Sequence, residues 1–143
     1  IGYNFRLTNI QAALGVAQLE QLRGFLERKK EIHQQYIEKV RKIEGLSIAP
    51  VPDYVYNNCW MNLLQIDTET YFEDREALMT RLEKNGIQTR PGWVLNHTRR
   101  PYQNCQSYKI EKAERLVNIS LCLPSSSKLK DREINKVIET LNG

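Results

Sequence analysis

The sequence has few of the residues that build disulfide frameworks or metal centres. Its 143 residues include three cysteines and two histidines. Cys59, Cys105 and Cys122 lie far apart, without a Cys-x-x-Cys pair or the Cys/His spacing of a zinc site. Apolar runs are also short, since none approaches the roughly 20 residues that a membrane-spanning helix needs. These absences predict a cytoplasmic protein with reduced thiols, no metal and no membrane segment.

The charge pattern argues against a nucleic-acid-binding domain. The net charge of +4 is mild, and lysine and arginine alternate with glutamate in residues 26–42 (LERKKEIHQQYIEKVRK). Such alternation is typical of a solvated helix face and not of a groove for phosphates. His33 lies in this segment, and we expect it to be a surface residue.

Apolar spacing predicts a domain that begins with one long helix. Thr8 and Gln11 have the spacing of a capping box, and the helical pattern continues from about Asn9 to Glu44, where Gly45 supplies a stop. A helix of this length often joins two domains or lies across a subunit interface.

The rest of the chain alternates between strand and helix patterns. We expect the fold class to be a small α/β layer, α+β-like, of about three strands covered by helices. The whole chain, 1–143, is predicted to be one domain, with a linking segment and long helix in 1–45 and the α/β part in 46–143. The pattern predicts an extended approach over 46–58, strands over 59–67 and 87–91 and from 119 into a polar turn, helices over 72–86, 108–118 and 130–143, and a loop over 92–107.

Two segments carry candidate binding residues. Asn4 and Arg6 precede the start of the long helix, where unpaired N–H groups and a partial positive charge attract anions. The alternative is that Asn4 shapes a turn and Arg6 pairs with a surface acid. The second segment is the polar loop, where aromatic and cationic side chains could stack on a base or sugar and pair with phosphates. Its alternative is an exposed basic loop, and its members are Arg90, Trp93, His97, Arg99, Arg100 and Tyr102.

No complete catalytic group emerges from the sequence. The serine run 125–127 lacks a Gly-x-Ser-x-Gly setting, and no pair of carboxylates stands out from the solvated faces. We therefore expect no catalytic residue in this chain.

Residues 2–22 (GYNFRLTNIQAALGVAQLEQL) resemble a segment of the DegT/DnrJ/EryC1/StrS family of pyridoxal-phosphate (PLP) sugar aminotransferases. The segments NGIQTRPGWVLNH, PYQNC and LCLPSS are similar to the closing region of that family, with a lean toward the branch that makes 4-amino sugars of the legionaminic-acid type. The resemblance implies the C-terminal domain of an aspartate aminotransferase-like enzyme of fold type I.

The resemblance also assigns roles to the candidate residues. It implies that Asn4 contacts the PLP phosphate of the neighbouring subunit in a homodimer and that Arg6 supports the same edge. It implies that His97 lines the sugar-nucleotide pocket, with Trp93 and Tyr102 as further parts of that wall.

The resemblance further implies that the large domain, with the lysine that carries PLP, precedes this chain and is absent from it. The parent enzyme would transfer an amino group, from glutamate, to a nucleotide-linked 4-keto sugar for surface polysaccharide synthesis. This chain alone should be inactive. The alternatives are a non-enzymatic helical interaction or dimerisation module and a basic nucleic-acid-binding domain.

Overall fold

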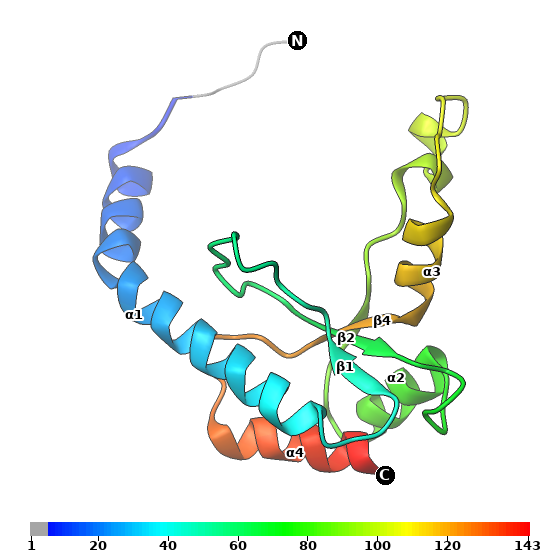
Figure 1. Cartoon of the computed structure of the whole chain (residues 1–143). Coiled ribbons are helices and arrows are strands. Elements are labelled where there is room, and N and C mark those ends of the chain that lie inside the picture. Colours follow the sequence, from blue (N-terminus) through cyan, green and yellow to red (C-terminus); the bar gives the residue numbers. More distant parts are fainter. Residues whose placement is uncertain (1–5) are drawn as a thin grey trace.

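The protein is described by a computed structural model over residues 6–143. It is a four-stranded sheet with helices on both faces (Figure 1). No helix in this part of the chain is long and apolar enough to cross a membrane. The helices are α1 (Asn9–Val40), α2 (Arg75–Lys84), α3 (Glu111–Ile119) and α4 (Asp131–Asn142), and the strands are β1 (Leu46–Ile48), β2 (Asn62–Ile66), β3 (Arg90–Pro91) and β4 (Ser120–Leu123).

The sheet is antiparallel throughout and has the strand order β1-β2-β4-β3. Its register pairs Leu64 with Leu121 and Leu63 with Cys122. Because successive side chains of a strand point to opposite faces, this register separates the apolar residues of β2 and β4 into two sets.

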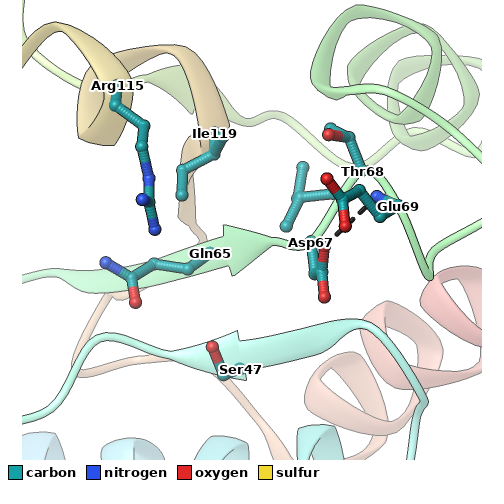
Figure 2. Close-up of a pocket in the computed structure, with 8 residues that line it drawn as sticks. Ser47, Gln65, Asp67, Thr68, Glu69, Arg115 and Ile119 are labelled. Carbon is teal, nitrogen blue, oxygen red and sulfur yellow. Dashed lines mark hydrogen bonds between the residues drawn. The ribbon is translucent and has the colours of Figure 1, made fainter.

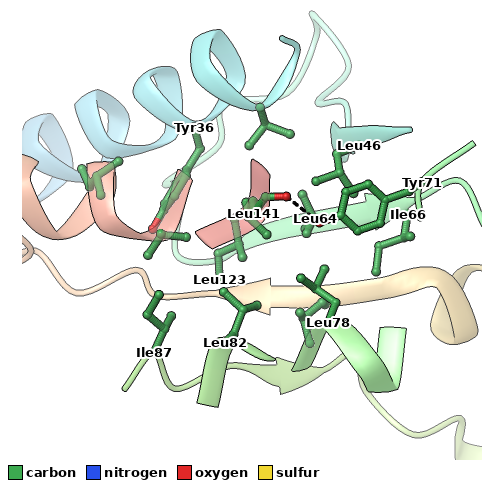
Figure 3. Close-up of a cluster of buried hydrophobic side chains, with 14 of the residues drawn as sticks. Tyr36, Leu46, Leu64, Ile66, Tyr71, Leu78, Leu82, Ile87, Leu123 and Leu141 are labelled. Carbon is green, nitrogen blue, oxygen red and sulfur yellow. Dashed lines mark hydrogen bonds between the residues drawn. The ribbon is translucent and has the colours of Figure 1, made fainter. Parts of the chain in front are cut away.

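One face of the sheet carries the hydrophobic core. Leu64, Ile66, Leu121 and Leu123 on this face pack against α1, α2 and α4 (Figure 3). The helices contribute residues at helical spacing, which explains why their apolar periodicity was visible in the sequence. These helical core residues are Ile32, Tyr36, Val40, Leu78, Leu82, Ile134, Val137 and Leu141.

The second face of the sheet is covered only in part, by α3, which contacts β2. In Figure 1 the loop before α3, the loop over 49–61 and the first half of α1 all project to one side of the molecule, away from α4. We call this second face the α3 face.

The structure corrects three expectations. The long helix ends at Val40 and not near Glu44. The sheet has a fourth strand, β1, in the segment expected to be merely extended, because its backbone pairs with β2. His33 is half-buried and not a surface residue, since its Nδ1 lies 2.8 Å from Oδ1 of the fully buried Asn62. The capping box of Thr8 and Gln11 is confirmed.

The two halves of α1 share the same apolar spacing but differ in burial. Its C-terminal third enters the core through Ile32, Tyr36 and Val40. Its first half is solvent-exposed in this chain, although the same spacing continues there. The large apolar side chains left exposed are Ile10, Leu14, Val16, Leu19 and Leu22.

A close backbone contact follows α1. Gly45 has φ +78°, and a Cβ on it would lie 2.5 Å from the backbone nitrogen of Tyr71. The Gly45 carbonyl also accepts a hydrogen bond of 2.8 Å from the Asp67 N–H. The Tyr71 hydroxyl in turn donates to the Leu141 carbonyl at 2.5 Å, which fixes the end of α4. A glycine is therefore required at position 45 by both conformation and space.

Replacing Gly45 with alanine should destabilise the fold. We expect Gly45→Ala to lower the free energy of unfolding by about 2–4 kcal/mol, because a left-handed backbone and a backbone clash act together. The control is Gly24→Ala, where nothing lies within 4 Å of the added Cβ. It should raise stability by about 0.5–1 kcal/mol, as expected for glycine in a helix. Urea denaturation of both variants measures the difference, and equal stability of the two would contradict the account.

The contacts of Asp131 should make the free energy of unfolding depend on pH in the acid range. The hydrogen bond from Arg28, at 2.8 Å, and a second from Gln35 hold the pKa of Asp131 below its ordinary 3.8. A depressed carboxyl pKa contributes stability that is present above 3.8 and lost as the pH falls through the lower folded-state value. We expect Asp131→Asn to melt below the parent at neutral pH and the gap to close in acid. A gap that is constant with pH would contradict this.

Candidate functional site

The loop between β3 and α3 is tied to the sheet at Gly92 and shaped further on by short hydrogen-bonded turns. Gly92 donates its N–H to the Ser120 carbonyl at 3.2 Å, so that the loop leaves the sheet beside the end of α3. Two 3-10 turns follow, Asn96–Thr98 and Arg100–Tyr102. The Thr98 hydroxyl donates to the Leu95 carbonyl at 2.8 Å. Such local bonds give a polar loop a defined shape on a rigid scaffold.

His97 and Tyr102 line the same pocket. The pocket has a volume of about 410 Å³ and also includes Tyr108. The imidazole Nε2 of His97 lies 3.3 Å from Oε1 of Glu114 on α3. This contact orients the ring, and the pocket combines hydrogen-bonding groups with aromatic surface.

Trp93 lines a neighbouring pocket and not the one that contains His97. This second pocket has a volume of about 510 Å³ and lies on the α3 face of the sheet. Leu95 and Asn96 line both pockets, so the two share a wall. The structure thus brings His97 and Tyr102 together in one pocket and places Trp93 in the adjoining pocket.

The indole of Trp93 lies against that of Trp60, with ring centroids 5.9 Å apart and an interplanar angle of 40°. These are the only two tryptophans of the sequence. Trp60 follows two turns in which the Asn57 and Asn58 side chains accept from the N–H groups of Cys59 and Trp60, at 2.9 and 3.0 Å. Trp60 was not among the predicted site residues. The available signals were an aromatic residue at the start of the predicted strand 59–67 and an Asn-Asn pair that favours turns.

Lys29 of α1 fixes the backbone at Trp60. Its ammonium group donates to the Trp60 carbonyl at 3.0 Å, to the Ser125 hydroxyl at 3.0 Å and to the Ser125 carbonyl. The Ser125 hydroxyl donates to the Trp60 carbonyl at 2.8 Å and accepts from the Asn62 amide. Burial lowers the pKa of Lys29 from its ordinary value. The lysine therefore joins the long helix to the base of the tryptophan loop.

The predicted anion site at the start of α1 is described in part. Asn4 lies outside the described residues. Arg6 is exposed, and the Thr8 N–H donates to Oε1 of Gln11 at 2.9 Å, which fixes the entry into the helix. A phosphate group would meet one guanidinium and the positive end of a helix here. These groups fit a contact at the edge of a PLP phosphate and not a site that encloses the cofactor. Arg6 is not part of the His97 pocket.

A third pocket, of about 610 Å³, lies at the other end of the α3 face (Figure 2). Figure 2 shows Arg115 and Ile119 of α3 above Gln65 and Ser47 of the sheet. Asp67, Thr68 and Glu69 close one side, so acidic and basic groups both face it. Across the described range, no group of three or more His, Cys, Asp or Glu side chains could hold a metal ion.

Comparison with known proteins finds sequences similar to this chain within longer proteins. The sequence model of the DegT/DnrJ/EryC1/StrS aminotransferase family matches residues 1–142. GDP-perosamine synthase of Escherichia coli O157:H7 is 36% identical over 143 residues, which are 99% of this chain and 37% of that protein. EpsN of Bacillus subtilis (strain 168), whose name includes the words pyridoxal phosphate-dependent aminotransferase, is 32% identical over 145 residues, with 99% and 37% covered.

Solved structures share the fold. The sugar aminotransferase CalS13 from Micromonospora echinospora superposes with a TM-score of 0.85 at 25% identity, over 99% of this chain and 36% of that one. DesI, solved in the presence of its TDP-sugar product, gives a TM-score of 0.86 at 26% identity, with the same shares covered. The chain therefore spans little more than a third of the length of these relatives.

Removing the Lys29 ammonium group should loosen the tryptophan loop. We expect Lys29→Met to lower the free energy of unfolding by about 1–3 kcal/mol, because the half-buried Ser125 carbonyl loses the donor that Lys29 supplies. Tryptophan emission should also shift, since Trp60 would no longer be fixed against Trp93. The matched control is Lys30→Met, whose ammonium group contacts only the exposed Tyr56 ring and hydroxyl among the described contacts. Equal effects of the two substitutions on emission would show that Lys29 does not hold the loop.

Proposed function

The chain belongs to the DegT/DnrJ/EryC1/StrS aminotransferase family, and we propose that it forms the C-terminal domain of a PLP-dependent enzyme that aminates a nucleotide-linked sugar. The family match over residues 1–142 carries this proposal. The relatives support the substrate class, because one is a GDP-perosamine synthase and another was solved with a TDP-sugar product. When bound, PLP supplies the chemistry that moves an amino group from donor to acceptor.

In this proposal the substrate is a nucleotide-linked 4-keto sugar, the amino donor is glutamate, and the product serves surface polysaccharide synthesis in the cytoplasm. The part of the protein that corresponds to the remaining length of the relatives would carry the lysine that binds PLP. This chain would contribute a wall of the substrate site from the loop that contains Trp93, His97 and Tyr102. Trp93 lines a pocket on the α3 face, and His97 and Tyr102 line the pocket that adjoins it, which supports that assignment.

Asn4 and Arg6 would reach the PLP phosphate of the neighbouring subunit in a homodimer. The exposed guanidinium of Arg6 at the start of a capped helix supports this role, because both charge and helix dipole favour a phosphate. The first half of α1 would then be covered in the full-length dimer, since five of its large apolar residues, Ile10, Leu14, Val16, Leu19 and Leu22, are exposed in this chain.

A purely non-enzymatic interaction module is the weaker alternative. It explains the exposed half of α1, but the family match extends well beyond that helix, through the loop and the sheet to residue 142. We therefore retain association as part of the aminotransferase proposal and not as a separate function.

Activity measurements test the proposal that this chain is one domain of a longer enzyme. The protein encoded by the complete reading frame should aminate a nucleotide-linked 4-keto sugar with glutamate, whereas residues 1–143 alone should neither bind PLP covalently nor turn over. In the longer protein, His97→Ala should lower kcat/KM about tenfold or more, as expected for loss of a substrate hydrogen bond. The control is Gln103→Ala, an exposed residue of the same loop. Turnover by residues 1–143 alone would overturn the proposal.

A further inference from the structure

The chain leaves the sheet after Gly92 and returns to it at Ser120, beside the point of departure. The Gly92 N–H donates to the Ser120 carbonyl at 3.2 Å, so a hydrogen bond joins the two ends of the 93–119 segment. Figure 1 shows this segment projecting from the sheet, with α3 as its returning arm. None of its residues is buried, whereas α1, α2 and α4 each have buried residues. The segment is therefore attached at its base and stands outside the core.

Contacts within the 93–119 segment tie its two arms together. Nε2 of His97, in the outgoing arm, lies 3.3 Å from Oε1 of Glu114 on α3. The pocket of about 410 Å³ is also lined from both arms, by residues as far apart as Leu95 and Ile110. The outgoing arm and α3 are thus linked to each other as well as to the sheet. A segment linked in this way moves as one body.

Few contacts hold this body against the rest of the chain. Within the described residues, one side-chain hydrogen bond joins the 93–119 segment to another element, from Nη1 of Arg75 on α2 to the Val117 carbonyl at 2.7 Å. The other contacts are the pairing of the Trp93 and Trp60 rings and the packing of α3 on β2. Segments with few buried apolar contacts are the ones that open or shift at the lowest free energy.

An apolar pocket separates part of α3 from the sheet. It has a volume of about 510 Å³ and is lined by Leu116 and Val117 of α3 on one side and by Met61 and Leu63 on the other. Leu116 is 36% exposed, so its side chain is not yet fully packed. Removing the apolar surface on the two sides from water is favourable, and movement of α3 toward the sheet achieves this.

We propose that the 93–119 segment is a lid that turns as one body about Gly92 and Ser120. The structure shows the lid open, and in the closed position Leu116 packs against Met61 and Leu63. This proposal concerns a motion of the chain, and its geometric basis is the hydrogen bond at the base, the absence of buried residues and the apolar pocket beneath α3.

The purpose of the lid rests on the proposed function. Trp93, His97 and Tyr102, which form the proposed wall of the substrate site, all lie on the 93–119 segment. Opening of the lid admits the substrate, and closing brings this wall against it and excludes water, as the lids of other enzymes do.

Distances between spin labels, measured by pulsed electron paramagnetic resonance on residues 1–143, test the motion. Cys105 is an exposed thiol on the lid, whereas Cys59 and Cys122 are buried and stay unlabelled. Combined with Lys136→Cys on α4, the label on Cys105 should give two distances, one for each lid position. Combined with Lys112→Cys on α3, it should give a single narrow distance, since both labels then lie on the same body.

Either of two results would overturn the proposal. One narrow distance between positions 105 and 136 would show a segment fixed on the fold. A broad distribution between positions 105 and 112 would show a segment that does not move as one body. If the segment is fixed but the longer protein still aminates its substrate, the lid fails and the proposed function stands. If two lid positions are found but no amination, the lid stands and the proposed function fails.

Arg75 supplies a matched pair of variants for the same measurement. The bond from Arg75 to the Val117 carbonyl is present in the open structure, so Arg75→Met should lower the ratio of open to closed lid about threefold, as expected for one hydrogen bond. The control is Glu76→Gln, which removes the ion-pair partner of Arg75 and leaves the Val117 carbonyl available to it. An unchanged ratio in Arg75→Met, or an equal change in both variants, would contradict the open position described here.

Discussion

The sheet is buried by three helices on one face and by one short helix on the other, and the rest of the molecule follows from this asymmetry. The alternation of β2 and β4 sends Leu64 and Leu121 into the core and leaves Leu63 and Ser120 on the α3 face. Because α3 covers that face incompletely, pockets remain on either side of it. The proposed site residues lie on or beside this open face, on a rigid scaffold of the kind that positions binding loops.

The two faces are connected through a few polar contacts. Lys29 extends from α1 to the carbonyls of Trp60 and Ser125. Asn62, at the start of β2, joins the same network through the Ser125 hydroxyl and links it to His33. Each of these polar groups is satisfied, which makes the network stabilising and specific in its geometry. The position of the tryptophan pair on the α3 face thus depends on a helix that packs against the opposite face.

Much of the fold could be predicted from the sequence. Ile134, Val137 and Leu141 have the helical spacing that burial on one face requires. The capping-box spacing of Thr8 and Gln11 predicts the start of α1. Strand β1 could not be predicted, because three residues carry no periodicity and its pairing with β2 is a tertiary contact. Trp60 was missed for a related reason, since only folding brings it to Trp93 across the chain. A tertiary contact with Asn62 also leaves His33 half-buried, although the alternating charges of its segment predict a solvent-exposed helix face.

The central claim is that the α3 face beside Trp93 is where this chain meets its substrate. The most direct measurement is a two-dimensional amide NMR spectrum of residues 1–143 with and without a nucleoside diphosphate. The account predicts shifts at Leu63, Leu116 and Ser120, which line the apolar pocket, and none at Ser47 and Gln65 in the polar pocket of the same face. Shifts confined to the polar pocket, or a spectrum that does not change, would contradict it.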